Sequence, residues 1–148
     1  MNRRDAFAGA GTLLMAAMAS EAAAQGMAHD HSHMHMHGSP RQDLINATSD
    51  CSAKAQVCLA HCVVLMGEGD KAMAGCAQAV NQTIALCNAL QSLAAQESSL
   101  VPALAKVTLE ACQACEKECR KHADKHVQCK DCAESCVACI KACKAAMA

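Results

Sequence analysis

Residues 112–143 read CQACEKECRKHADKHVQCKDCAESCVACIKAC, and the spacing of the cysteines in this stretch decides the fold. In its second half the cysteines recur at intervals of 3, 4, 3 and 4 residues, and in its first half at intervals of 3 and 4. Such intervals keep side chains on one face of an α-helix, as in the seam of a helix that faces a bundle core. The stretch therefore predicts two helices, one with Pro102 in its first turn and ending near His122, the other from about Asp124 to Met147. We place a tight turn near Asp124 because an unbroken helix would be unusually long.

A third helix is expected to start at Ser39. Its hydroxyl can cap the helix, Pro40 fits the first turn, and Gln42 completes a capping box. The helix should continue to about Met66, where the sequence Gly67-Glu68-Gly69 breaks it.

A fourth helix is expected between these elements. Asp70 can cap it, and it should continue to about Gln96 before Ser98 and Ser99 mark the next turn. Short connections make neighbouring helices antiparallel, and no run of residues alternates with the period of a β-strand. The sequence predicts an all-α fold, an antiparallel up-down-up-down four-helix bundle with a Cys-lined core, over residues 39–148.

All 13 cysteines of the chain fall at seam positions where a bundle normally carries Leu and Ile. They are Cys51, Cys58, Cys62, Cys76, Cys87, Cys112, Cys115, Cys119, Cys129, Cys132, Cys136, Cys139 and Cys143. If so many thiols served only as small hydrophobic side chains, the core would lose much apolar volume compared with a core of Leu and Ile. Disulfides within a helix are strained, because Cβ atoms at these spacings lie about 5–6 Å apart whereas a disulfide needs about 3.8 Å. Disulfides between helices stay open, with one thiol left over from the odd count.

Metal binding is the interpretation that fits the whole seam best. Thiolate sulfur is a soft ligand that selects Cu(I), zinc or iron–sulfur clusters. The zinc-ribbon spacings are absent, and iron–sulfur motifs sit in loops, commonly with a proline after the last ligand. Cu(I) accepts two or three thiolates and tolerates bridging, so we expect many Cu(I) ions per chain. The alternative is a disulfide-braced secreted structural protein.

Neutral ligands of Cu(I) gather at one end of the expected bundle. In the up-down-up-down arrangement the loop after Met66 and the turn near Asp124 lie at the same end. We expect copper to enter there. The candidate residues are His61, Met66, Met73, His122 and His126. At the opposite end Val101, Ala105 and Thr108 would form a plug.

Residues 1–24 form an expected export signal peptide. Two arginines, Arg3 and Arg4, precede an apolar run, and Ala22-Ala23-Ala24 supplies the small residues of a cleavage site. The run is too short to span a membrane, and no later segment could cross one. The paired arginines resemble a twin-arginine signal, with an ordinary Sec signal as the alternative. We expect a periplasmic protein.

Residues 25–38 form an expected flexible tail rich in His and Met. Histidines recur at every second position from His29 to His37, with Met34 and Met36 between them. Imidazole suits Cu(II), Zn and Ni while thioether suits Cu(I), so the mixture favours copper. A passive solvated tail is the alternative.

Composition argues against nucleic acid as a partner. The net charge is -1, and the only aromatic residue, Phe7, lies in the expected signal peptide. A mature chain without aromatic side chains has no platform for stacking bases.

Apolar side chains beside the thiol seam predict a homo-oligomer. They lie on the first two helices of the bundle, whereas the last helix carries charges outside its seam. The apolar residues are Val57, Leu59, Val63, Val64, Leu86 and Leu93, and the charged ones are Lys130, Asp131, Glu134, Lys141 and Lys144. Exposed apolar flanks of this kind usually mark a partner surface.

The cysteine pattern of residues 112–143 resembles that of the bacterial four-helix-bundle copper storage proteins. The resemblance covers roughly residues 41–147, and the export signal is similar to that of the exported branch of the family. It implies Cu(I) bound inside the bundle mostly by Cys pairs, a homotetramer, and a store that supplies a copper enzyme, such as particulate methane monooxygenase in methanotrophs, or a copper chaperone. The His/Met tail is not part of the resemblance.

We therefore expect a non-enzymatic Cu(I) storage or buffering protein that supplies or sequesters copper. A copper-detoxifying sequestrant would use the same chemistry. A thiol–disulfide enzyme is disfavoured, because its Cys-x-x-Cys motif normally follows a strand in an α/β fold and no strand is expected here.

Overall fold

The computed structural model describes residues 40–147, which form an all-α bundle. Its elements are α1 (Pro40–Gly67), the 3-10 turn η1 (Lys71–Met73), α2 (Ala74–Ala95), α3 (Val101–Arg120) and α4 (Val127–Ala146). No strand occurs among these residues. The predicted fold class is confirmed. The predicted signal peptide, the His/Met tail and the Ser39 cap lie outside the described residues.

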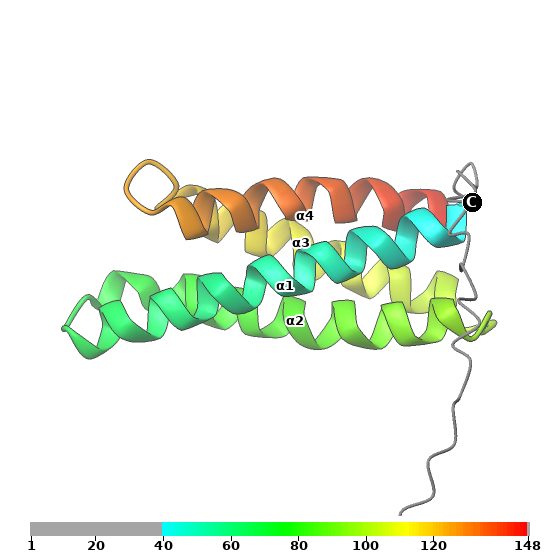
Figure 1. Cartoon of the computed structure of the whole chain (residues 1–148), viewed down its shortest axis with the longest axis horizontal. Helices are drawn as coiled ribbons and strands as arrows, with labels where there is room; N and C mark the ends of the chain where they lie inside the picture. Colours follow the sequence, from blue (N-terminus) through cyan, green and yellow to red (C-terminus); the bar gives the residue numbers. More distant parts are fainter. Residues whose placement is uncertain (1–39, 148) are drawn as a thin grey trace, which may run out of the picture. The chain divides into compact units, whose positions relative to one another are not determined.

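The four helices form a closed ring in which each packs against two neighbours. The contacting pairs are α1 with α2, α2 with α3, α3 with α4, and α4 with α1. The loop between α1 and α2 and the loop between α3 and α4 lie at one end of the bundle, which we call the mouth end (Figure 1). The α2–α3 loop, the start of α1 and the end of α4 lie at the other end, which we call the terminal end (Figure 1). This is the predicted up-down-up-down order.

The loop after α1 follows from the glycine at position 69, whose φ is 99°. The amide of Asp70 donates to the carbonyl of Leu65 at 2.9 Å and that of Gly69 to Met66 at 3.0 Å, which is a Schellman motif. Asp70 then accepts a hydrogen bond from the amide of Ala72 at 3.0 Å. Asp70 therefore caps η1 directly, and the regular α2 helix begins one turn later than the sequence pattern predicts.

The end of α2 uses the same motif without a glycine. Glu97 has φ 55°, and the amide of Ser98 donates to the carbonyl of Leu93 at 3.0 Å. Glu97 also pairs with Arg41 at 2.7 Å. The pair ties the start of α1 to the α2–α3 loop, but both partners are exposed, so its contribution to stability is small.

Cysteine dominates the core of the bundle. All the cysteines are fully buried, and the larger fully buried side chains besides them are led by Leu44, Met73, Leu90 and Val80. The terminal end is packed by residues that are not metal ligands, namely Leu44, Thr48, Leu90, Ala94, Ala105 and Thr108. The thiols occupy most of the rest of the interior, toward the mouth, together with Ala55, Met73, Val80, Thr83 and Ala133. None of the helices described is long and apolar enough to cross a membrane.

Candidate metal centre

Each helix contributes thiols to one continuous interior column. The seam of α4 carries Cys129, Cys132, Cys136, Cys139 and Cys143; that of α3 carries Cys112, Cys115 and Cys119; that of α1 carries Cys51, Cys58 and Cys62; and that of α2 carries Cys76 and Cys87. Every one of these cysteines is a free thiol. The structure thus brings together all the cysteines that the sequence pattern places on the seam.

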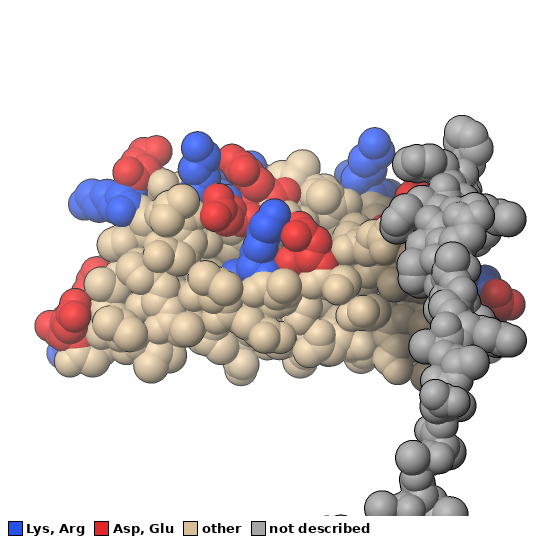
Figure 2. Space-filling model, viewed as in Figure 1, with Lys and Arg blue, Asp and Glu red and all other residues tan. Residues whose placement is uncertain are grey.

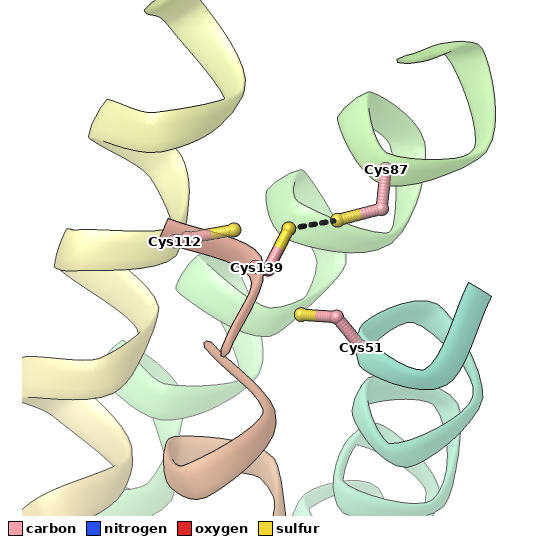
Figure 3. Close-up of side chains that lie close together, drawn as sticks. All are labelled: Cys51, Cys87, Cys112 and Cys139. Carbon is pink, nitrogen blue, oxygen red and sulfur yellow. Dashed lines mark hydrogen bonds between the residues drawn. The ribbon is translucent and has the colours of Figure 1, made fainter. Parts of the chain in front are cut away.

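Toward the terminal end, one cysteine from each helix forms a four-sulfur cluster. The sulfurs of Cys51, Cys87, Cys112 and Cys139 all lie within 4.8 Å of one another. Figure 3 shows the four side chains pointing toward a common centre, with the sulfurs of Cys87 and Cys139 3.9 Å apart. Cys143 contacts Cys139 one turn further along α4.

A second four-sulfur cluster lies at the mouth end. The sulfurs of Cys58, Cys62, Cys76 and Cys129 lie within 4.8 Å of one another. The sulfur of Cys58 lies 4.0 Å from that of Cys76 and 3.8 Å from that of Cys129. This cluster combines α1, α2 and α4.

Two three-sulfur groups connect the clusters. One comprises Cys58, Cys119 and Cys132, and the other comprises Cys115, Cys132 and Cys136. Cys58 is shared with the mouth cluster and Cys132 is shared by the two groups. The sulfurs of Cys136 and Cys51 lie 3.8 Å apart, which joins the column to the terminal-end cluster.

The sulfur separations suit bridging by a metal ion. Contacts across the column range from 3.5 Å, between Cys76 and Cys119, to 4.0 Å, between Cys58 and Cys76. A disulfide requires about 2.05 Å. With metal–sulfur bonds of about 2.3 Å, two sulfurs on one ion lie at most about 4.6 Å apart, and about 4.0 Å apart in a trigonal site. Neighbouring thiolates can therefore share an ion with little movement.

The sharing of sulfurs between groups favours Cu(I) over zinc. A cluster of four thiolates alone would suit a tetrahedral zinc ion. However, Cys58 and Cys132 each belong to two groups, and structural zinc sites are closed. A soft ion that accepts two or three thiolates and tolerates bridging sulfur fits the column throughout.

Burial and contact between thiols shift their acidity in both directions. Burial raises the pKa of Cys62, and the nearby Cys58 and Cys76 raise it further. Contacts with Cys119 and Cys132 lower the pKa of Cys115. The thiols of the metal-free column therefore differ in how readily they lose a proton. Binding of a cation to the thiolates must displace the protons that remain.

The predicted histidine ligands flank the mouth. Nε2 of His61 on α1 lies 2.9 Å from Nδ1 of His126, the residue before α4, and the ring centres are 4.8 Å apart. Each is close to a mouth-cluster thiol in the chain: Cys62 follows His61 directly, and Cys129 lies three residues after His126, with its amide donating to the carbonyl of His126 at 3.1 Å. His122 is half-buried, and its carbonyl accepts from the amide of His126 at 3.0 Å.

Of the two paired histidines, His126 lines a cavity at the surface. This cavity of about 540 Å³ is lined by Arg120, Ala123, Asp124, Lys125, His126, Val127, Lys130 and Glu134. Of the predicted methionine ligands, Met73 is fully buried and Met66 is half-buried against the core. Among the described residues no histidine belongs to a close group of three ligand atoms, so the neutral ligands remain a prediction.

The contact between His61 and His126 was not part of the sequence prediction. The sequence places each near a different loop of the mouth end, and the closeness of α1 and α4 brings them together. At the terminal end, two of the predicted plug residues, Ala105 and Thr108, are buried and Val101 is half-buried; their role as a plug stays a prediction. The hydroxyl of Thr108 donates to the carbonyl of Leu104 at 2.9 Å, so it is satisfied without a metal.

The comparisons with known proteins agree on one family. The family model for copper storage proteins (Csp) matches residues 37–148. A solved structure, the Cu(I)-bound copper storage protein BsCsp3, matches with a TM-score of 0.66 at 22% identity, over 74% of this chain and 100% of that one. At that identity the structural match supports the fold alone. No curated protein matches the chain.

Proposed function

This chain belongs to the copper storage protein family, and we propose that it is a non-enzymatic store that holds many Cu(I) ions on the thiolates inside its bundle. The observation that carries the proposal is the continuous column of free, buried thiols from Cys62 at the mouth to Cys143 at the terminal end. A single cofactor site needs a few ligands in one place, whereas a store needs many equivalent ligands in contact with one another.

Copper capacity tests this function. Each Cu(I) needs at least two thiolates and each thiolate can bridge two ions, so saturation is expected at about 10 to 13 Cu(I) per chain. The measurement is an anaerobic titration of the reduced protein against a coloured Cu(I) chelator. A plateau at one or two ions would refute storage.

The disulfide-braced alternative predicts a different result. All the cysteines are free in the structure, so protein purified without reductant under anaerobic conditions should react with a thiol reagent at all its cysteines after denaturation. A structural disulfide protein would react at one or a few. The same assay serves as a control for the copper titration, because oxidised thiols would lower the apparent capacity.

We also propose that the chain is exported to the periplasm, where it would supply or sequester copper for exported proteins. The paired arginines at Arg3 and Arg4 followed by an apolar run support export. Folding in the cytosol before export would let the thiols stay reduced or metallated before they meet an oxidising compartment.

A self-association surface on α1 and α2 is part of this proposal. The α2 helix contains no Asp, Glu, Lys or Arg, and exposed Val57, Val63 and Val64 lie on the neighbouring α1. Figure 2 shows a broad area without charged side chains over α2, whereas charged side chains gather over α4 and part of α1, which carries the ion pair of Asp50 with Lys54. An uncharged face of this extent supports a homo-oligomer, and we propose a tetramer.

A charge on this surface should disturb assembly. Val63 is 55% exposed and Val137, on the charged α4 helix, is 46% exposed. The Val63→Glu variant is expected to elute as a smaller species in size-exclusion chromatography with light scattering, because a buried unpaired carboxylate is costly. Val137→Glu is the matched control and should leave the mass unchanged. Equal masses for both variants and the unaltered protein would contradict the assignment of this face.

A further inference from the structure

The sulfur contacts divide the thiol column into two groups that meet at one residue. The mouth group consists of Cys58, Cys62, Cys76, Cys115, Cys119, Cys129 and Cys132. The deep group consists of Cys51, Cys87, Cys112, Cys139 and Cys143. Cys136 belongs to neither group and contacts both.

Cys136 makes contacts in both directions along the column. On the deep side its sulfur lies 3.8 Å from that of Cys51 and also contacts Cys112. On the mouth side it forms a close group with Cys115 and Cys132. Among the sulfur contacts of the described chain, no pair joins the two groups without Cys136.

Within the mouth group, the thiols are connected to one another by more than one route. Cys58 contacts Cys119 at 4.0 Å, and Cys76 contacts Cys119 at 3.5 Å. Cys115 is reached both from Cys119 at 3.9 Å and from Cys132 at 3.7 Å. Loss of one thiol here leaves a second path, whereas loss of Cys136 leaves none.

We propose that Cys136 is the relay thiolate through which Cu(I) passes between the mouth group and the deep group. The proposal rests on the proposed function, since it concerns the movement of stored copper. An ion held by Cys115 and Cys132 gains Cys136 as a third ligand before one of its first bonds breaks. Cys51 then binds the ion and a mouth-group sulfur leaves. Copper stays Cu(I) throughout, and the proton displaced from each incoming thiol passes to the departing thiolate.

The direction of filling follows from the two ends of the bundle. Buried Leu90 and Thr108 lie one helical turn past the terminal-end four-sulfur cluster, as Cys143 does, and buried Leu44, Ala94 and Ala105 lie further toward the terminal end. The histidine pair and the surface cavity lined by His126 lie at the mouth end. Copper that enters at the mouth must therefore cross Cys136 to reach the deep group.

The α4 helix supplies a matched control for Cys136. Cys132 lies one turn earlier on the same seam and is equally buried. Its removal leaves the path from Cys119 through Cys115 to Cys136, because Cys115 contacts both of those residues. Replacing either thiol with Ala removes the same number of atoms from the same kind of site, but only one of the two changes should cut the column.

The experiment compares loading of Cys136→Ala, Cys132→Ala and the unaltered protein. Each reduced protein is mixed with a coloured Cu(I)–chelator complex and the transfer is followed over time. At intervals the remaining thiols are alkylated and mapped by peptide mass spectrometry. Circular dichroism establishes that each variant is helical, and Cys136→Ser, which keeps nearly the same volume with a poor ligand for Cu(I), is the second variant.

The relay predicts two kinetic phases only for the Cys136 variants. Cys132→Ala and the unaltered protein should protect all their thiols in one process. In the Cys136 variants the deep group should fill at least about tenfold more slowly than the mouth group, because transfer without a bridging sulfur crosses a higher barrier. Uptake indistinguishable from that of Cys132→Ala, or filling of the deep group first, would overturn the relay. Failure of all the proteins to bind more than one or two ions would instead overturn the storage function itself.

Discussion

The melting temperature of the reduced chain is expected to rise by about 15 °C or more when its first tightly held Cu(I) binds. An ion at 1,000 times its dissociation constant stabilises the folded state by about 4 kcal/mol if the unfolded chain does not bind it. For a domain of this size each kcal/mol shifts the melting temperature by about 4 °C or more. Several ions act together, so the filled protein should melt above about 90 °C.

The metal-free core is poor in apolar volume, so the melting temperature before copper is added should be modest. Leu44, Leu90, Met73 and Val80 lead the larger fully buried side chains apart from cysteine, and the described chain holds no aromatic residue. Thiols are small and weakly polar, so their burial contributes less than the leucine layers of an ordinary bundle. The surrounding helices should still form without metal, but with a modest free energy of unfolding.

Thermal unfolding followed by circular dichroism checks this expectation. The reduced protein is melted alone, after stepwise addition of Cu(I), and again after an excess of a Cu(I) chelator removes the metal. Return of the original melting temperature would show that bound copper causes the shift. An unchanged melting temperature at full loading, or a random-coil spectrum without metal, would contradict the view of a preformed bundle that copper stabilises.

The fold was predictable from the sequence because one periodic signal repeats along it. The spacing of the cysteines in α3 and α4 already places every thiol of residues 112–143 on a helical seam, and all of them are buried. Gly67 and Gly69 mark the loop between α1 and α2. The end of α2 carries no such signal, since Glu97 takes the left-handed conformation that usually selects glycine.

The contacts between sulfurs of different helices were not predictable in this way. Periodicity shows which face of a helix points inward, but it does not show how far one helix is shifted along its neighbour. The contact between Cys51 and Cys136 depends on that shift, and so does the role of Cys136 as a bridge. The sequence likewise places His61 and His126 at one end of the bundle without showing that their rings meet.

Removal of the histidine pair is expected to slow copper loading by about tenfold, which corresponds to about 1.4 kcal/mol in the barrier, while the final copper count stays near that of the unaltered protein. Imidazole is a neutral and weaker ligand for Cu(I) than thiolate. It can therefore catch an ion at the surface and yield it to Cys62 or Cys129 one step inward. The double variant His61→Ala, His126→Ala removes both rings that flank the mouth cluster.

A comparison of rate with capacity separates an entry role from a storage role for these histidines. The Cys62→Ala variant changes a residue at the same end of the bundle but removes a storage ligand, so it should lower the copper count. The histidine variant should instead lengthen both loading from a Cu(I) complex and removal by an excess chelator, because ions pass the mouth in both directions. Further replacement of His122, Met66 and Met73 should lengthen both processes again if they belong to the same path. Unchanged kinetics in the histidine variant with an intact copper count would show that copper reaches the thiols by another route, since the column itself would still be complete from Cys62 to Cys143.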